Sequence, residues 1–202
     1  MNKDEVVSIL KLNKLQVEKI DFFLASIIKQ NKHTNLIGRS TINNIWERHV
    51  LDCLQLTNHI ESKRSNILDL GTGAGLPGVL FSIVGYQNVL MIESVKKKTD
   101  FIKQVIKELS LLAEIQNNRI EKIKNKEPDV IVSRALAPLN KLLTYALMHK
   151  NKNTTLLFLK GRNVNVEIEK AMEVFDFKYE KKPSISSEEG CVLKVNNIKK
   201  NV

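Results

Sequence analysis

The chain has 202 residues, of which 43% are hydrophobic, and it carries a formal net charge of +10. This length fits one domain with a sizeable core, and no run approaches the roughly 20 apolar residues that a membrane-spanning helix needs. The charge favours a polyanionic partner, but the excess is spread as +3, +2 and +5 over residues 1–65, 66–140 and 141–202, so folding must assemble any basic face.

The N-terminus and the cysteines narrow the class of protein. The first residues, Met1–Val7, lack the apolar stretch of a secretory signal, so we expect a cytoplasmic protein. Cys53 and Cys191 are the only cysteines and have no metal-type spacing. We expect both to be inert, buried thiols and expect no metal site.

The first third of the chain is predicted to be helical. Apolar residues recur at helical spacing over residues 4–30, which indicates one or two amphipathic helices. After a polar stretch, Thr41 is expected to cap a helix that runs to about His59, with Trp46 on its inner side. His33 and His49 have no partner at a catalytic spacing and are interpreted as structural or interface residues. Residues 1–62 are therefore predicted to form a helical extension packed on a core of residues 63–202.

Strands and helices alternate through the remainder of the chain. This alternation predicts an α/β fold with a mostly parallel, seven-stranded sheet, helices on both faces and an antiparallel C-terminal strand. The expected strands cover residues 67–70, 89–92, 113–116, 129–132 and 154–159, followed by a closing antiparallel pair at 174–180 and 191–195. The expected helices cover residues 97–112, 139–148 and 164–172, and another begins at Pro77.

A glycine-rich turn follows the first strand, where residues 67–78 read ILDLGTGAGLPG. A strand, a glycine turn and a helix N-terminus together form a cradle for a nucleoside-bearing ligand. Gly73, Gly75 and Gly78 satisfy the dinucleotide fingerprint, with Glu93 downstream as its acidic residue. Gly71, Gly73 and Gly75 equally satisfy the G-x-G-x-G loop of S-adenosylmethionine (SAM) binders. A plain connecting turn is the third alternative, and the glycines alone do not decide between them.

Polar residues also follow the other parallel strands, and these strand ends meet at one edge of the sheet. Glu93 is placed to accept hydrogen bonds from ribose hydroxyls, although it would also serve as a helix cap. Residues 117–121 follow the third strand, Ser133-Arg134-Ala135 the fourth, and Lys160-Gly161-Arg162 the fifth. An arginine directly after a buried strand is costly unless it has a partner. We therefore expect Arg134 to take part in the site.

Several of these segments, in this order, resemble the small-subunit rRNA methyltransferase G family (RsmG, also called GidB). The resemblance covers the chain from about residue 20 onward, and its most specific part is the Arg-His-x-x-Asp helix before the glycine loop. The matching segments are Asn35-Leu36, Arg48–Leu54, Asp69–Gly78, Ile92–Ser94, Ser133–Ala135 and Leu159–Gly161. The family implies a class I SAM-dependent methyltransferase fold, with a Rossmann-like sheet, and methylation of N7 of guanosine 527 in the 530 loop of bacterial 16S rRNA.

The resemblance also implies roles for individual residues. The expected cofactor contacts are Gly71, Gly73, Gly75, Leu76, Glu93, Ile120, Glu121 and Arg134, of which Glu93 holds the ribose and Ile120-Glu121 flank the adenine. Arg134 is also expected to position the target base, without an acid or base role. The expected RNA contacts are Arg48, His49, Lys160 and Arg162. The chain departs from the family at Gly190-Cys191, where a basic residue often precedes the last strand.

The chemistry of guanine N7 fits this inventory. N7 has an in-plane lone pair and no proton, so aligning it with the methyl donor is most of the catalytic work. The chain has neither the Asn-Pro-Pro-Tyr motif of amine methylation nor a Pro-Cys nucleophile motif. We expect a monomer that acts on 16S rRNA or the 30S subunit with SAM. The alternatives are a methyltransferase of another RNA, a non-catalytic RNA-binding or ribosome-assembly factor, and an NAD-dependent oxidoreductase, for which no hydride-transfer pair is found.

Overall fold

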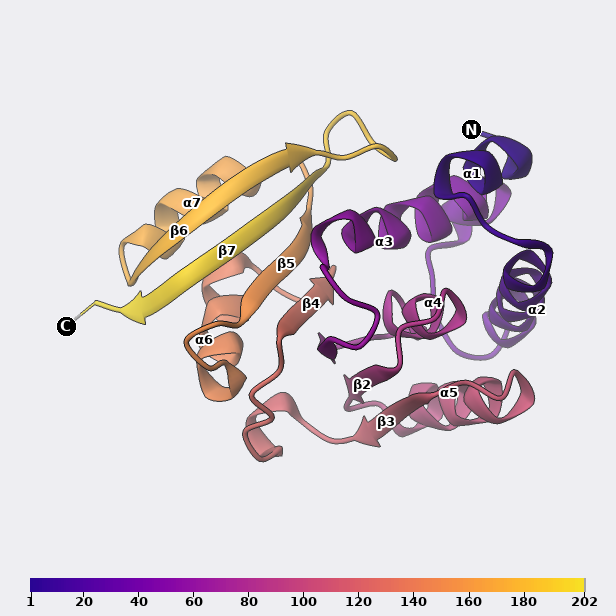
Figure 1. The fold of residues 1–202 in the computed structure, drawn as a ribbon, viewed down its shortest axis with the longest axis horizontal. Coiled ribbons are helices and arrows are strands. Elements are labelled where there is room, and N and C mark those ends of the chain that lie inside the picture. The colour runs from indigo at the N-terminus through magenta and orange to yellow at the C-terminus, as the bar shows by residue number, and fades with distance from the viewer. Residues whose placement is uncertain (202) are drawn as a thin grey trace.

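The structure, a computed structural model that describes residues 1–201, is built around one seven-stranded sheet (Figure 1). Its strands are β1 (Asn66–Leu70), β2 (Asn88–Glu93), β3 (Ala113–Asn117), β4 (Val130–Arg134), β5 (Thr155–Lys160), β6 (Phe175–Pro183) and β7 (Cys191–Lys200). They lie in the order β3-β2-β1-β4-β5-β7-β6, and β7 runs antiparallel to both of its neighbours. The predicted sheet is confirmed, and β6 and β7 are longer than the sequence indicated.

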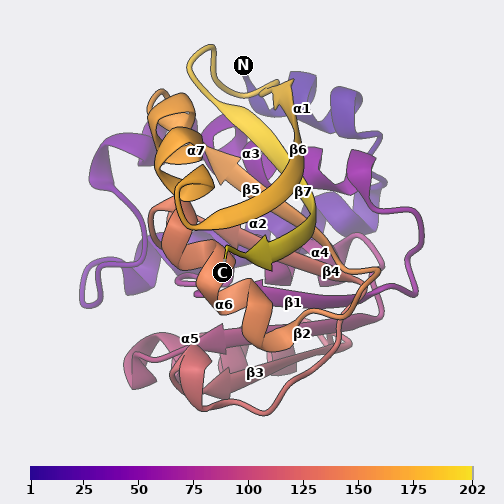
Figure 2. The same ribbon diagram turned by 90° about the vertical axis from the view of Figure 1, so that its left-hand side faces the viewer.

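Helices cover both faces of this sheet. The α-helices are α1 (Lys3–Leu10), α2 (Lys14–Gln30), α3 (Asp52–Leu54), α4 (Gly78–Ile83), α5 (Lys96–Glu108), α6 (Leu139–His149) and α7 (Val164–Met172). Four further helical segments of 3-10 or π type are η1 (Arg39–Asn44), η2 (Trp46–Leu51), η3 (Gln55–His59) and η4 (Ile120–Lys122). In the view of Figure 2 the β6–β7 hairpin lies foremost, with α6 and α7 beside it.

The period of two along each strand divides the apolar residues between two cores. In β1, Ile67 faces the core shared with the N-terminal helices, α4 and α5, whereas Leu68 and Leu70 face the core under α6 and α7. Asp69 lies between these residues and is fully buried on the side of α4. The strand therefore delivers a carboxylate directly under the start of the following helix.

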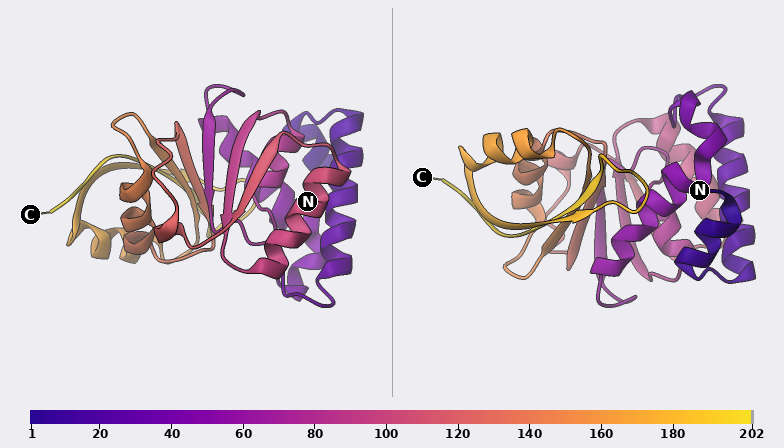
Figure 3. Two further views of the ribbon diagram at one scale, coloured as in Figure 1. Left: turned by 90° about the horizontal axis from the view of Figure 1, so that it is seen from below. Right: turned by 90° about the horizontal axis from the view of Figure 1, so that it is seen from above.

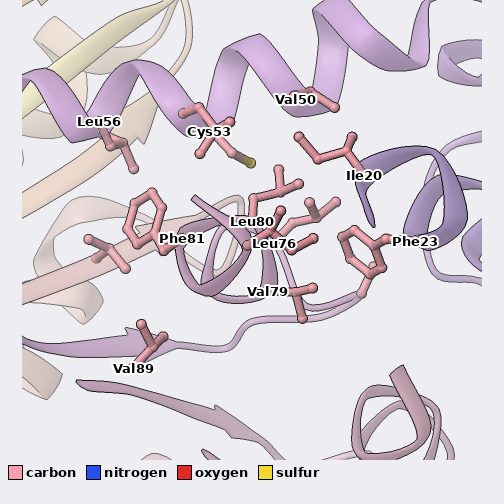
Figure 4. Close-up of a cluster of buried hydrophobic side chains, with 14 of the residues drawn as sticks. Ile20, Phe23, Val50, Cys53, Leu56, Leu76, Val79, Leu80, Phe81 and Val89 are labelled. Atoms are coloured by element: carbon pink, nitrogen blue, oxygen red, sulfur yellow. The ribbon is translucent and has the colours of Figure 1, made fainter. Parts of the chain in front are cut away.

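The N-terminal helices pack on the same side as α4 and α5. α1 and α2 each begin with an asparagine capping box, made by Asn2 with Glu5 and by Asn13 with Gln16. Figure 4 shows the shared core, in which side chains of α2 and of the segment from η2 to η3 meet those of α4 and β2. The open end of the β6–β7 hairpin lies at the opposite end of the molecule from the N-terminal helices, and the loop between β6 and β7 reaches back toward them (Figure 3). We propose that residues 1–62 and the core form one compact unit.

Some local predictions are wrong in detail. Thr41 does not cap a helix, because it lies inside η1, which begins at Arg39. The N-cap residue of η1 is Gly38, and no side chain caps this helix. The single helix expected up to His59 is a succession of 3-10, π and α turns, in which Trp46 is buried as expected. Pro77 precedes α4 as its N-cap residue, and α5 ends at Glu108 rather than Leu112.

Candidate functional site

The glycines after β1 adopt the left-handed conformation that the loop requires. Gly71, Gly73 and Gly75 have φ angles of 69°, 61° and 90°. A β-carbon on Gly71 would lie 2.5 Å from Leu136 Cδ1, and one on Gly75 would lie 2.6 Å from Val79 Cγ2. At Gly73 the nearest atom would be the Gly71 carbonyl oxygen at 3.9 Å. Gly71 and Gly75 are thus required by packing, whereas Gly73 leaves room for a ligand to approach the backbone.

Glu93 closes the other side of this loop. It ends β2, which pairs in parallel with β1, and its side chain is only 7% exposed. Its Oε2 accepts a hydrogen bond from the Gly73 N–H at 3.1 Å, and Oε1 accepts one from the Val95 N–H at 2.8 Å. The carboxylate is held in place, and each oxygen keeps a lone pair for a further donor. The two parts of the expected cofactor site, the glycine turn and Glu93, are therefore in direct contact.

Asp69 supports the loop from below. Its Oδ2 accepts hydrogen bonds from Thr72 Oγ1 at 2.6 Å and from the Gly78 N–H at 2.9 Å. Its Oδ1 has no hydrogen-bond partner among residues 1–201. Burial raises the pKa of Asp69 to about 7, against a partial lowering by these hydrogen bonds. The sequence placed Asp69 at the strand end, but only its burial shows that its charge is costly.

The remaining expected cofactor residues lie around this loop in different environments. Leu76 is buried in the core above β2 (Figure 4). Ile120 is buried under α6, and its carbonyl oxygen lies 3.2 Å from His149 Nε2. Glu121 is exposed and accepts a hydrogen bond from the Tyr145 hydroxyl at 3.0 Å. Of these three, Glu121 has the side chain that a ligand can reach without rearrangement of the core.

Arg134 ends β4 and is bound by three side chains from the Arg48–Leu54 segment. Its Nη2 lies 2.6 Å from His49 Nδ1, its Nη1 donates to Cys53 Sγ at 3.1 Å, and its Nε lies 3.4 Å from Asp52 Oδ2 in an ion pair. Residues 49, 52 and 53 share one helical face, because they are spaced by three and four. The sequence pointed to Arg134 and His49, but it missed Asp52 and Cys53 as partners, since their spacing places them on the face of His49 without showing that this face meets Arg134.

The hydrogen bonds fix the tautomer of His49. Arginine only donates, so Nδ1 accepts from Arg134 and the proton lies on Nε2. Nε2 lies 2.7 Å from Thr41 Oγ1, which itself donates to the Gly38 carbonyl oxygen. Burial, followed by the positive charges of Arg134 and Arg48, lowers the pKa of His49 to about 3. His49 is therefore a neutral acceptor that orients Arg134.

A cleft of about 500 Å³ opens beside this cluster, and its lining includes Leu136, the residue that a β-carbon on Gly71 would meet. It lies where β4 and β5 end, and its lining includes Arg48, His49, Arg134, Leu136, Lys160 and Gly190. Lys160 is 8% exposed and forms a 2.5 Å ion pair with Glu167. Arg48 is exposed, and Arg162, which is 75% exposed, forms an ion pair with Glu189. Contact between Lys160 and RNA would therefore require its ion pair to open, whereas both arginines are accessible.

Among residues 1–201, no helix combines the length and the hydrophobicity that a membrane span requires. No three His, Cys, Asp or Glu side chains gather in that part of the chain as metal ligands would.

Solved structures with the same fold define the class. The chain aligns with a ribosomal protein L11 methylase from Lactobacillus delbrueckii subsp. bulgaricus at 19% identity and a TM-score of 0.59, over 73% of this chain and 76% of that chain. It aligns with fibrillarin from Aeropyrum pernix, solved with natively bound SAM, at 15% identity and a TM-score of 0.57, over 74% of this chain and 75% of that chain. The architecture is the class I Rossmann-like fold of SAM-dependent methyltransferases.

Sequence relatives identify the family. The model of the GidB family, described as rRNA small subunit methyltransferase G, matches residues 16–194. A "Ribosomal RNA small subunit methyltransferase G" from Cereibacter sphaeroides is 36% identical over 200 residues, covering 96% of this chain and 97% of that protein. One from Rickettsia rickettsii is 37% identical over 184 residues, covering 91% and 95%. The chain belongs to the rRNA small subunit methyltransferase G family, and it is a SAM-dependent methyltransferase.

The loop offers groups that a nucleoside-bearing cofactor needs. The open space at Gly73 and the fixed Glu93 carboxylate suit the nucleoside part of SAM, the cofactor of this family. Gly78 is tightly packed, because a β-carbon there would lie 2.4 Å from Met91 Cγ. The third glycine of a dinucleotide fingerprint serves the same close packing, so the family match rather than the loop geometry decides in favour of SAM.

Proposed function

We propose that the protein methylates N7 of guanosine 527 in the 530 loop of bacterial 16S rRNA. The observation that carries this proposal is the family match over nearly the whole chain, together with the junction of its most specific helix with Arg134. Leu136 supports the proposal, because it lines the cleft and would also meet a β-carbon on Gly71 of the glycine loop. A 16S rRNA substrate also implies that the protein acts in the cytoplasm, and we propose a monomer.

The residues of the glycine loop would bind and orient the cofactor. When bound, SAM supplies a methyl group on a positively charged sulfur, which is open to attack by a lone pair. Gly71, Gly73 and Gly75 would hold it against the loop backbone, Leu76 would support that backbone from the core, and Glu93 would accept hydrogen bonds from its ribose hydroxyls. Ile120 and Glu121 would flank its adenine.

The target nucleotide would lie in the cleft at the ends of β4 and β5. Because guanine N7 carries no proton, the site needs no general base, and His49 is unsuited to that role with both of its ring nitrogens engaged. Arg134 would position the nucleotide through a phosphate rather than touch N7, since methylation places positive charge on the base. The RNA would run along Arg48, His49, Lys160 and Arg162. Lys160 would contact the RNA only after its ion pair with Glu167 opens.

Transfer of tritiated methyl groups tests this proposal. The wild-type protein is incubated with labelled SAM and 30S subunits that lack the modification, and the labelled nucleotide is mapped. We expect one methyl group per subunit at N7 of guanosine 527. Label at another nucleotide would refute the position, and SAM binding with no transfer to naked rRNA or 30S subunits would favour the non-catalytic alternative.

A further inference from the structure

The loop between β6 and β7, residues 184–190, is tied to the segment before β1 by one buried glutamine. Gln55 is 3% exposed. Its Nε2 donates to Ser184 Oγ at 3.0 Å and lies 3.4 Å from Ser186 Oγ, while its Oε1 accepts from the Ile185 N–H at 3.0 Å. Figure 1 shows this loop above α3, far along the chain from it. Gln55 thus binds Ser184 and Ile185 and lies against Ser186.

The same network continues to Arg134 through Asp52. Asp52 Oδ1 accepts hydrogen bonds from Ser186 Oγ at 2.8 Å and from Gln55 Nε2 at 3.2 Å. Its other oxygen, Oδ2, forms the ion pair with Arg134 Nε at 3.4 Å. The Asp52 side chain is 22% exposed and that of Arg134 is 18% exposed, so solvent screens this pair only in part. One carboxylate is therefore shared between the loop and the arginine.

The loop is also a wall of the cleft. Ser187 and Gly190 line the cleft, as does the Arg134–Pro138 segment. The loop is closed by backbone hydrogen bonds from Gly190 N–H to the Ser187 oxygen and from Ser184 N–H to the Gly190 oxygen. A β-carbon on Gly190 would lie 3.1 Å from Ser184 Cβ, so a side chain there would disturb this turn. At Gly190-Cys191, where this chain departs from the resemblance described above, it has a compact turn that Gln55 holds through Ser184 and Ile185.

We propose that Asp52 is a positioning residue for Arg134, and that Gln55 and Ser186 couple the 184–190 loop to that same arginine as part of the RNA-binding site. The part of this proposal that concerns RNA binding rests on the proposed function, whereas the positioning of Arg134 does not. One oxygen of Asp52 binds Ser186 and the other pairs with Arg134. A change in the loop would therefore make Arg134 more mobile, and loss of the Asp52 carboxylate would make both the loop and Arg134 more mobile. His49, being neutral, cannot replace the negative charge of Asp52 beside Arg134.

A double-mutant cycle with Asp52→Asn and Arg134→Gln tests the coupling. The asparagine keeps an oxygen for Ser186 and Gln55, and it replaces the charged acceptor that Arg134 faces with an NH2 donor. We expect Asp52→Asn to lower kcat/KM for deficient 30S subunits about tenfold, and less than twofold when Arg134 is already glutamine. SAM affinity by calorimetry stays unchanged. An equal loss in both backgrounds would show that Asp52 has a merely structural role and would overturn the proposal.

The coupling of the 184–190 loop is tested with Gln55→Leu and Ser186→Ala, and Thr57→Ala is the matched control. Thr57 is on the same segment and donates only to the Leu54 carbonyl oxygen, away from the loop. We expect both loop variants to raise the KM for 30S subunits several-fold and leave kcat and SAM affinity near wild type, while Thr57→Ala changes neither. An unchanged KM in both loop variants would contradict the coupling.

A measurement without RNA separates this inference from the proposed function. In the wild-type protein the Nε–Hε NMR signal of Arg134, assigned through its loss in Arg134→Gln, should exchange slowly with water. We expect exchange about tenfold faster in Asp52→Asn, faster also in Ser186→Ala, and unchanged in Thr57→Ala. Equal exchange in all variants would overturn the positioning role whatever RNA the enzyme methylates. A lack of methylation by the wild type, with the exchange pattern intact, would overturn only the proposed function.

Discussion

Substitution of Asp69 by asparagine should change how stability depends on pH. In the folded protein burial raises the pKa of Asp69 from 3.8 to about 7. Between these values the unfolded chain has released the proton and the folded protein retains it, so wild-type stability falls as pH rises. The loss ends once pH exceeds the folded pKa. Asparagine has the same shape and does not titrate, so this loss disappears in the variant.

The size of the effect follows from the shift. Each pKa unit corresponds to about 1.36 kcal/mol, so from pH 5 to pH 8 Asp69 lowers wild-type stability by about 2.7 kcal/mol. The free energy of unfolding of Asp69→Asn relative to wild type should therefore rise by about that amount over this range. The cost of burying the new amide group, which lies beside the unpartnered Oδ1 position, is the same at both pH values and cancels.

Urea denaturation of both proteins at pH 5 and pH 8 measures this difference directly. Other titrating groups are present in both proteins, so their contributions cancel to first order. Ser82→Ala is the control, because Ser82 is buried in α4 and its hydroxyl does not titrate in this range. Its difference from wild type should be the same at both pH values. A pH-independent difference for Asp69→Asn would refute the argument that burial keeps this carboxyl protonated.

Three further substitutions test the packing and charges of the site. Gly78→Ala should destabilise the fold by about 1–3 kcal/mol in urea denaturation, because the new methyl group would lie 2.4 Å from Met91 Cγ; an unchanged midpoint would contradict this packing. Glu93→Gln should weaken SAM binding in calorimetry about tenfold with the fold intact by circular dichroism, and unchanged affinity would exclude Glu93 as a ligand. Glu167→Ala should cost about 3 kcal/mol of stability because it leaves the Lys160 charge buried without its partner. Adding Lys160→Met to that variant should restore the part of the loss that comes from the unpaired charge but not the part from the Leu139 N–H, whose hydrogen bond Glu167 also accepts at 2.7 Å; no recovery at all would show that the ion pair contributes nothing.

Local sequence determined the order and type of most elements. Strand and helix periods are properties of neighbouring residues, so β1 to β5, α6 and α7 appear where the apolar spacing places them. The glycine loop was equally legible, because left-handed φ angles at Gly71, Gly73 and Gly75 demand glycine whatever surrounds them. The same local rules failed for residues 39–59, because apolar spacing does not distinguish α turns from the 3-10 and π turns found there.

Tertiary structure alone decided what the polar residues of the site do. Arg134 meets His49 and Cys53, which precede it by 85 and 81 residues, and no local pattern encodes such a pairing. Lys160 was expected to contact RNA, but folding pairs its mostly buried side chain with Glu167. The sequence shows the charge and the hydrogen-bonding groups of each residue by itself. Their burial, pKa and partners depend on which distant segments the sheet brings together.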